Sequence, residues 1–218
     1  MDLQTAIKKP FGDMKTLAIG MILMIIPLVN ILTIPGYILK LASKTMKGDK
    51  KLPKFENFGE LVVDSLKAIV TLFIHGILFT IVATILAFIP IIGPILAFVW
   101  MIVFMFIMVS GVLTLAKTKS IVAAINVPEL VKKAMKPDFI IAVIVAAIIS
   151  MIISGLVSGI LIAIFGAALL PTLMVDPAQL MNMLGALLGA GAIFYIVSAV
   201  LGFVIYVFFI TLVAEAYK

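Results

Sequence analysis

Few side chains in this sequence could carry out chemistry, and the most conspicuous of them is His75. It is the only histidine, and it lies inside a long apolar run that has no acidic or basic residue. A titratable group in such a position is a candidate functional site. It can equally be satisfied by a single hydrogen-bonding partner on a neighbouring helix. Both interpretations stay open, and Asn30, which interrupts another apolar run, is a second candidate polar site.

The sequence offers no partners with which His75 could build a metal centre or a catalytic set. A metal site or proton relay needs further ligands at the same depth, and a nucleophile needs a base and an orienting acid. The chain has no cysteine and no phosphate-binding glycine-rich loop. Glu56, Glu60 and Asp64 follow one another at helical spacing, where a solvated helix face is favoured over a cation site. We therefore expect no enzyme, no cofactor and no metal.

The composition defines the environment in which these residues lie. Hydrophobic residues make up 65% of the 218 residues and charged residues 12%. Soluble domains contain about half and about a quarter, so a soluble fold of this size could not cover so much apolar surface. A bilayer can, because lipid tails act as the solvent. The length suits one integral membrane domain over residues 1–218.

Five apolar runs have the length of membrane-spanning or membrane-entering helices. They cover residues 17–39, 68–88, 95–116, 139–170 and 184–214. The uncharged, Pro- and Gly-rich turn at 89–94 joins the second run to the third, and a connector with one acid joins the last two. We expect an all-α polytopic membrane protein with two transmembrane hairpins and an N-terminal broken or re-entrant segment.

All 16 basic residues are lysines, and they lie in the segments that flank or connect the apolar runs. The positive-inside rule places such lysine-rich segments on the cytoplasmic side of the membrane. We therefore expect a multi-pass protein of the cell membrane with both termini in the cytoplasm. Lysines near a membrane surface also attract anionic lipid headgroups. The predicted headgroup-binding residues are Lys40, Lys44, Lys47, Lys50, Lys51, Lys54, Lys132, Lys133 and Lys136.

The first run has two possible topologies. It is interrupted between Pro27 and Asn30, and lysines flank it on both sides. A single crossing would leave the N-terminal lysines outside, whereas a hairpin that re-enters would keep every lysine inside. Proline removes a backbone donor, and asparagine tolerates turn conformations. We favour the re-entrant hairpin, and the full crossing stays open.

The two basic connectors are predicted to contain interfacial amphipathic helices. In the first, Pro53 suits the first turn, and apolar residues then recur at helical spacing. This stripe consists of Phe55, Phe58, Val62 and Leu66. In the second connector, Glu129 can pair with lysines one turn away. Lysine-rich helices with an apolar stripe are typical of segments that lie on a membrane surface.

Small residues recur four apart in both of the last two runs. Gly155 and Gly159 form one pair, and Gly185 and Gly189 form the other. Such spacing lets helices approach closely. It predicts either packing between these two runs or an interface with a second copy or a partner membrane protein.

A loose internal repeat relates residues 10–116 to residues 111–218. Each unit has an apolar run that ends in a glycine-led segment, at Gly36 and at Gly111, and then a basic connector. Each connector carries Glu-Leu-Val, at Glu60 and at Glu129. Gene duplication would explain the match, and so would the general similarity of membrane helices with basic ends.

The first seventy residues resemble the DUF4013 family of uncharacterised membrane proteins. The resemblance lies in Pro10-Phe11-Gly12-Asp13, in Gly36-Tyr37, and in Leu52-Pro53-x-Phe55-x-x-Phe58 with Gly59 and Asp64. The chain departs from the family in having phenylalanine at position 55, where tryptophan is frequent, and lysine where arginine is frequent. The resemblance implies a small multi-span protein with no assigned activity.

These observations favour a non-catalytic membrane protein that organises lipids or partner membrane proteins. No basic module interleaved with aromatic residues is present, so nucleic acid is not an expected partner. A channel or transporter for a small solute or ion is the alternative, because discontinuous helices can frame a substrate site. Buried acids, which secondary transporters commonly use, are missing from the apolar runs.

Overall fold

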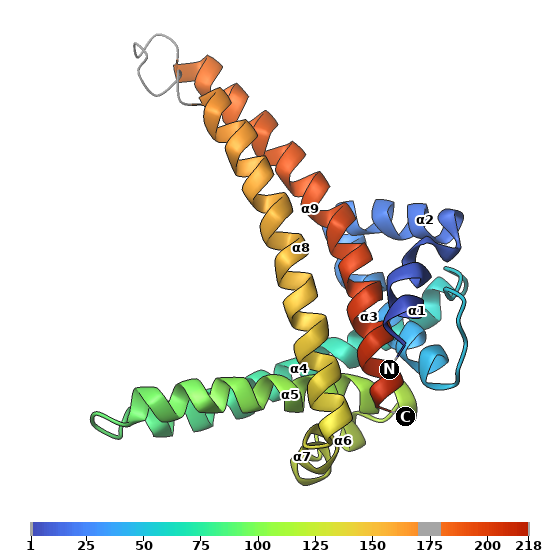
Figure 1. Ribbon diagram of the computed structural model, residues 1–218, viewed down its shortest axis with the longest axis vertical. Coiled ribbons are helices and arrows are strands. Elements are labelled where there is room, and N and C mark those ends of the chain that lie inside the picture. The colour runs from blue at the N-terminus through green and yellow to red at the C-terminus, as the bar shows by residue number, and fades with distance from the viewer. Residues whose placement is uncertain (1, 170–179, 218) are drawn as a thin grey trace.

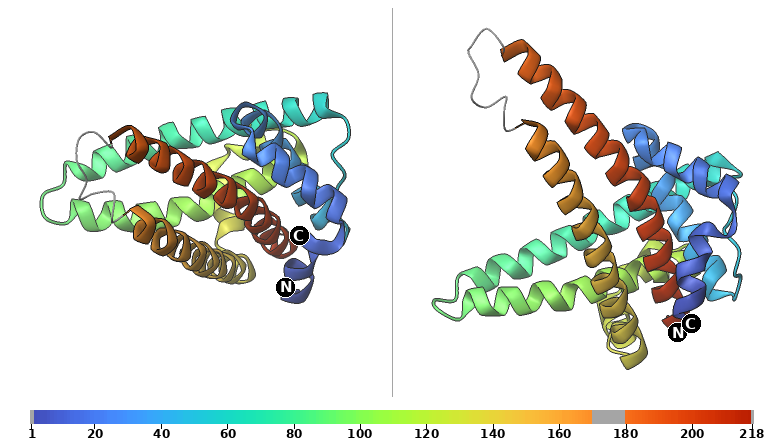
Figure 2. Two further views of the ribbon diagram at one scale, coloured as in Figure 1. Left: turned by 90° about the horizontal axis from the view of Figure 1, so that it is seen from above. Right: turned by 45° about the horizontal axis from the view of Figure 1, so that its top comes forward.

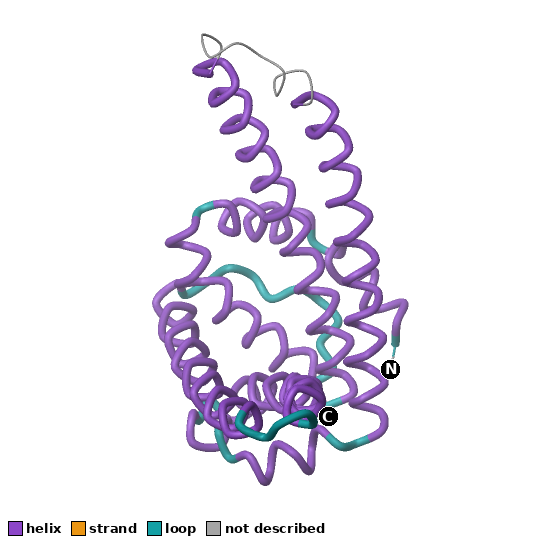
Figure 3. Tube along the Cα trace, turned by 90° about the vertical axis from the view of Figure 1, so that its left-hand side faces the viewer, coloured by secondary structure: helices purple, strands orange, loops and turns teal. Residues whose placement is uncertain are grey.

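The computed structural model describes residues 2–169 and 180–217, and every regular element in these ranges is a helix (Figure 1 and Figure 3). The order is α1 (Leu3–Lys8), η1 (Lys9–Gly12), α2 (Met14–Ile25), α3 (Pro27–Met46), α4 (Phe58–Ala87), α5 (Gly93–Thr118), α6 (Ile121–Ala124), α7 (Val127–Ala134), α8 (Pro137–Leu169) and α9 (Leu180–Ala216). The all-α prediction is therefore confirmed for the described residues.

Four of these helices are long and apolar enough to cross a membrane, namely α4, α5, α8 and α9. The helix α4 packs against α5 and α8 packs against α9, and the two pairs diverge from a common base (Figures 1 and 2). Large apolar side chains on their outer faces are exposed, among them Ile85, Phe98 and Ile160. Lipid covers such side chains at no cost. The chain is thus a multi-pass membrane protein.

The first apolar run is broken into two helices by a single residue. Ile26 has extended backbone angles, φ −91° and ψ 106°, between the end of α2 and the start of α3. The cause is Pro27, because a proline disfavours helical geometry at the residue before it and is itself well suited to the first turn of the next helix. The predicted interruption therefore lies at the proline, three residues before Asn30.

The helix α3 continues through a second proline, and α4 accepts a hydrogen bond from the amide that follows it. Pro35 lies inside α3, where proline normally disturbs the hydrogen-bond ladder. The next amide, that of Gly36, donates to Ser65 Oγ on α4 at 2.8 Å. A Cβ atom at Gly36 would overlap the carbonyl oxygen of Leu61. Glycine is thus what allows α3 and α4 to approach closely at this point.

The core lies at the base of the molecule, where α2, α3 and α9 meet the connector between α3 and α4. Tyr37 stacks on Phe55 with ring centroids 4.0 Å apart, and Phe203 lies 5.6 Å from Tyr37 and 6.2 Å from Phe55. The same Phe203 ring fills the space where Gly20 has no side chain. Aromatic burial of this kind stabilises a fold strongly, and here it joins the N-terminal segment to α9.

The first predicted interfacial helix does not exist as a separate element. Residues 49–57 are irregular, and Phe58 begins a helix that continues to Ala87 without a break. No proline occurs within 58–87 to end the helix earlier. Two residues of the predicted stripe, Phe58 and Leu66, are exposed on α4, as residues of a face in contact with lipid would be, whereas Leu61 is buried. Pro53 lies in the irregular connector. The second predicted helix is a separate element, α7, and it buries Leu130.

Candidate functional site

A partly open apolar cavity of about 640 Å³ lies between α2, α3, α4, α5 and α9. Ligand sites commonly have volumes of roughly 300–1,000 Å³. Four methionines line it, namely Met24, Met101, Met105 and Met108. The only polar side chains in its lining, among the described residues, are those of Asn30 and Tyr206. The cavity therefore suits a hydrocarbon group better than a charged one.

Asn30 has a structural role at the wall of this cavity, because it closes the break between α2 and α3. Its side-chain amide donates to the carbonyl of Met24 at 3.3 Å, and its backbone amide donates to the carbonyl of Ile26 at 2.8 Å. The carbonyl of Ile25 accepts from the Tyr195 hydroxyl of α9 at 3.1 Å. All three carbonyls at the break are hydrogen-bonded within the protein, as a hydrocarbon environment requires.

His75 is fully buried on α4 and does not line the cavity. Its Nδ1 atom lies 2.9 Å from the Thr71 carbonyl oxygen, one helical turn away. The ring is edge-on to Phe104, with centroids 6.0 Å apart, and a Cβ atom at Gly111 would lie 2.7 Å from its Cε1 atom. Within the described residues Nε2 has no hydrogen-bond partner. His75 and Asn30 are therefore not brought together, and no acid is in hydrogen-bond contact with the ring.

A buried hydroxyl network joins α5, α7 and the end of α9. The Tyr217 hydroxyl lies 2.5 Å from Thr114 Oγ1 and 3.2 Å from Ser110 Oγ, and it donates to the Ser110 carbonyl at 3.1 Å. Ser110 Oγ donates to the carbonyl of Leu130 on α7 at 3.2 Å. Sequence reasoning missed this network, although Ser110 and Thr114 are spaced by one helical turn on one face of the third run.

The three acids of the first connector do not form a cation site. Asp64 is buried and forms an ion pair with Lys119, which has left-handed backbone angles (φ 58°) directly after α5. Glu56 and Glu60 are exposed. Within the described residues no cluster of three acids, histidines or cysteines could hold a metal. The solvated-face interpretation is thus wrong for Asp64, which joins the start of α4 to the end of α5.

The nine predicted headgroup lysines fall into two groups. The first group makes contacts within the protein: Lys40 approaches the carbonyls of Lys54 and Glu56 at 3.4 and 3.5 Å, and ion pairs join Lys44 to Asp49 at 3.6 Å, Lys54 to Glu56 at 4.0 Å and Lys133 to Glu129 at 3.9 Å. The second group is exposed and has no ion pair within the described residues: Lys47, Lys50, Lys51, Lys132 and Lys136. The second group is the more available to a ligand.

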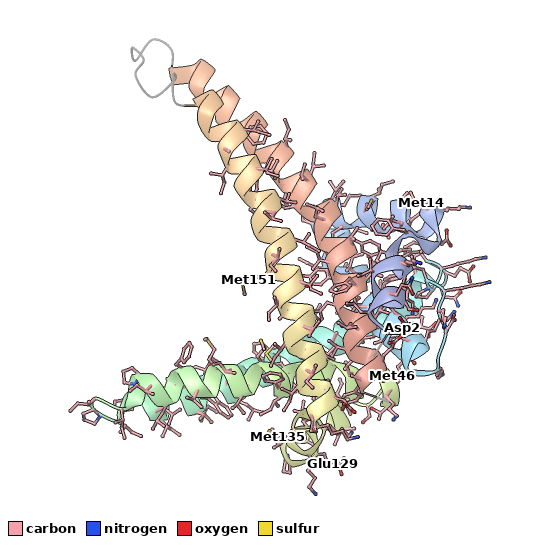
Figure 4. The ribbon with its side chains drawn as sticks, viewed as in Figure 1. Asp2, Met14, Met46, Glu129, Met135 and Met151 are labelled. Atoms are coloured by element: carbon pink, nitrogen blue, oxygen red, sulfur yellow. The ribbon has the colours of Figure 1, made fainter. Side chains whose placement is uncertain are left out.

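The charged side chains lie mainly around the base of the molecule, near the labelled residues Asp2, Met46 and Glu129 in Figure 4.

Local hydrogen bonds favour the charged form of two acids in this region, Asp49 and Asp13. The backbone amide of Lys51 donates to the Asp49 carboxylate at 2.9 Å, and this bond, with the charges of Lys44 and Lys9, lowers the pKa of Asp49. Asp13 caps α2 by accepting from the Thr16 amide, and the bonds from Thr16 lower its pKa.

Lys9 joins the two flanks of the broken first run. Its Nζ atom is buried and donates to Thr45 Oγ1 at 2.7 Å and to the Asp49 carbonyl at 2.8 Å. Lys9 precedes α2, whereas Thr45 and Asp49 lie at and beyond the end of α3. The residues that precede α2 and the residues that follow α3 therefore lie side by side.

A second, smaller pocket of about 220 Å³ lies where the C-terminal ends of α3 and α5 meet. Its lining consists of Ser43 and Met46 of α3, Lys47 directly after α3, and Lys117 of α5. Lys47 is one of the predicted headgroup lysines, whereas Lys117 is not. The proximity of the two follows from the packing of α3 against α5, which a linear sequence does not reveal.

The four glycines of the last two runs lie outside the α8–α9 contact. A Cβ atom at Gly155, Gly159, Gly185 or Gly189 would meet no other atom within 4 Å. The buried positions of this helix pair lie nearer the base, for example Val143 on α8 and Phe203 on α9. The interface with a second copy or a partner protein stays a prediction.

The residues that carry the family resemblance now have structural roles. Gly36 packs on Leu61, Tyr37 stacks on Phe55, and Asp64 pairs with Lys119. A family described as a protein of unknown function, DUF4013, matches residues 19–163, which confirms the resemblance. No curated protein and no solved structure matches the chain.

Proposed function

Because the chain belongs to the DUF4013 family of proteins of unknown function, we propose its role from its own geometry. It is a non-catalytic integral membrane protein that organises lipids, and membrane proteins beside it, from the cytoplasmic leaflet of the cell membrane. The observation that carries this proposal is the group of exposed lysines that have no ion pair among the described residues, at the base of a largely apolar helical molecule. Each lysine near an anionic membrane surface contributes about 1 kcal/mol to lipid attraction.

The proposed topology has two transmembrane hairpins, α4–α5 and α8–α9, with both termini in the cytoplasm. The segment α2–α3 is a re-entrant hairpin. Two observations support this arrangement: Lys9 holds both flanks of the segment together, and α2 has 12 residues, or about 18 Å, which is roughly half of a bilayer core. A single crossing would separate the flanks by about 30 Å. In this topology α7 lies at the inner interface.

Cysteine labelling tests this topology directly, because the native chain has no cysteine. Gly12→Cys and Lys51→Cys place one thiol on each flank, and Ile91→Cys places one at the α4–α5 turn. A membrane-impermeant maleimide added to intact cells should label Ile91→Cys alone, and permeabilised cells should show labelling of all three. Labelling of Gly12→Cys from outside would refute the re-entrant hairpin.

Lipid organisation is tested with the protein in vesicles that contain phosphatidylcholine and phosphatidylglycerol. Spin-labelled phosphatidylglycerol should be motionally restricted by the protein more strongly than spin-labelled phosphatidylcholine. Replacing Lys50, Lys51, Lys132 and Lys136 with glutamine should reduce this preference, and replacing the same four with arginine should preserve it. Equal restriction of both lipids by the native protein would refute the proposal.

The proposal includes an outer packing face on α8 and α9 for a second copy or a partner membrane protein. Gly155 and Gly159 support it because they are exposed and adjoin no other element, and small residues permit close helix contact in lipid. Gly155→Leu should lower the yield of cross-linked oligomer in native membranes, whereas Gly59→Leu should not. An unchanged yield would remove this face from the proposal.

A channel or transporter is the second candidate, and the broken α2–α3 segment beside a cavity is the observation in its favour. Two features make it the weaker candidate. The carbonyls at the break already have donors, and the described lining of the cavity carries no charged side chain. Flux of ions or small solutes through proteoliposomes that disappears in a cavity-filling variant would favour it over lipid organisation.

A further inference from the structure

We propose that the groove between α3 and α5 binds one anionic phospholipid of the cytoplasmic leaflet. Its phosphate lies against Lys47 and Lys117, and one of its hydrocarbon chains occupies the apolar cavity. This inference rests on the proposed function, because it assigns a particular lipid to a particular place. It follows from three features: the apolar cavity, the pocket lined by Lys47 and Lys117 (the cationic pocket), and the positions of these two spaces along α3 and α5.

The cavity is suited to a hydrocarbon chain and to little else. It lies among helices long and apolar enough to cross a membrane, so the medium at its opening is lipid. Water in it would find few partners, since the Asn30 side-chain amide already donates to Met24. Methionine side chains adapt their shape to a flexible ligand, and four of them line this space.

The smaller pocket supplies the complementary charge. It combines the ammonium groups of Lys47 and Lys117 with the hydroxyl-bearing Ser43. Both lysines are exposed, and neither has an ion pair in the part of the chain that the structure describes. Lysine is a common phosphate ligand. A headgroup with net negative charge fits, whereas a choline or ethanolamine headgroup would bring a further cation beside the two ammonium groups.

The two pockets follow one another in the order that an amphiphile requires. On α3, Leu39 lines the cavity and Ser43 lines the cationic pocket. They are one helical turn apart on the same face, or about 6 Å along the axis. On α5, Val112 lines the cavity and Lys117 the cationic pocket, about 7.5 Å further along. The charges therefore lie just beyond the inner end of the apolar space on both helices.

Native mass spectrometry of the purified full chain tests the assignment. The protein is transferred from nanodiscs of equal phosphatidylcholine and phosphatidylglycerol into mild detergent, and the retained lipid is identified. We expect one retained phospholipid per chain, with about a thirtyfold preference for phosphatidylglycerol from the two lysines. Retention of no lipid, or of both lipids equally, would overturn the inference.

Two pairs of variants separate the headgroup contact from the chain contact. The double variant Lys47→Gln with Lys117→Gln should lose this preference. Its control, Lys8→Gln with Lys15→Gln, removes the same charge at exposed positions outside the pocket and should keep it. Gly76 lines the cavity, and a Cβ atom there meets nothing within 4 Å. Gly76→Phe should therefore abolish retention of either lipid.

Gly59→Phe, at an open position outside the cavity lining, is the control for added bulk and should retain the lipid. If Gly76→Phe fails to fold, the lysine pair still decides the question in a folded background. An unchanged preference in Lys47→Gln with Lys117→Gln would overturn the inference.

Failure here is distinguishable from failure of the proposed function. If the native protein restricts spin-labelled phosphatidylglycerol in vesicles but retains none in detergent, this site is wrong and lipid organisation stands. If it does neither, both are wrong.

Discussion

Replacing Gly36 with alanine perturbs the closest approach between α3 and α4. The new methyl group would overlap the Leu61 carbonyl, so the two helices must separate. Overpacking of this kind costs about 1–3 kcal/mol. Separation also weakens the 2.8 Å bond from the Gly36 amide to Ser65 Oγ, and a buried donor left without a partner costs about 1–3 kcal/mol. Alanine returns about 1 kcal/mol in helix propensity. The net expectation is a loss of roughly 3 kcal/mol.

Reversible unfolding in mixed micelles of increasing SDS content measures this loss. The single tryptophan, Trp100, reports on it because its ring packs against Phe104 at 5.3 Å and its indole N–H donates to the Phe79 carbonyl across the α4–α5 pair. Ser65→Ala removes the hydrogen bond alone and should cost about 1–2 kcal/mol. Gly76 is on α4, as Ser65 is, but at an open position. Gly76→Ala should therefore stabilise the fold by up to about 1 kcal/mol. If Gly36→Ala is as stable as the native protein, the close approach has been misjudged.

Three further perturbations follow from contacts described above. Asn30→Ala combined with Tyr195→Phe strips two donors from the break between α2 and α3; at about 0.6 kcal/mol per interhelical bond in lipid, SDS unfolding should show a loss of about 1 kcal/mol, and no loss would mean that the carbonyls are satisfied otherwise. Tyr217→Phe removes a hydroxyl shared by α5 and α9 and should lower stability by about 1–3 kcal/mol in the same assay, whereas an effect near zero would contradict the network. Because the pKa of Asp49 is lowered, its carboxylate contributes stability at pH values above its ordinary pKa of 3.8, and this contribution is lost as the pH falls through the lowered pKa. Between pH 6 and pH 3 the thermal unfolding midpoint should therefore fall less steeply in Asp49→Asn than in the native protein. Identical slopes would refute the assignment.

The sequence predicted what depends on composition along the chain. Apolar length identified the four long helices, because a helix that lipid solvates needs only a run of apolar residues. Pro27 predicted the break between α2 and α3, because a proline disfavours helical geometry at the residue before it. The family resemblance was confirmed. It could be recognised from the sequence because its residues, such as Gly36 and Tyr37, form short motifs of neighbouring residues.

What could not be predicted depends on which helix faces which. Asp64 belongs to a helical series of acids, yet its partner Lys119 is 55 residues away. The apolar stripe from Phe55 to Leu66 was predicted to form a separate interfacial helix, but Phe58 and Leu66 belong to the long helix α4. Helical periodicity alone cannot distinguish a separate helix from the first turns of a longer one. The hydrogen-bond partners of Tyr217 lie more than 100 residues earlier in the chain. The cationic pocket was missed for the same reason.

The ring of Phe203 has a consequence for biogenesis. It covers Gly20 and flanks the Tyr37–Phe55 stack, but α9 leaves the ribosome well after those residues have been inserted. Until α9 has been synthesised, the surface formed by Gly20, Tyr37 and Phe55 lacks the ring that covers it. This aromatic core is therefore completed only by the last helix, and a chain truncated before α9 would leave the surface uncovered.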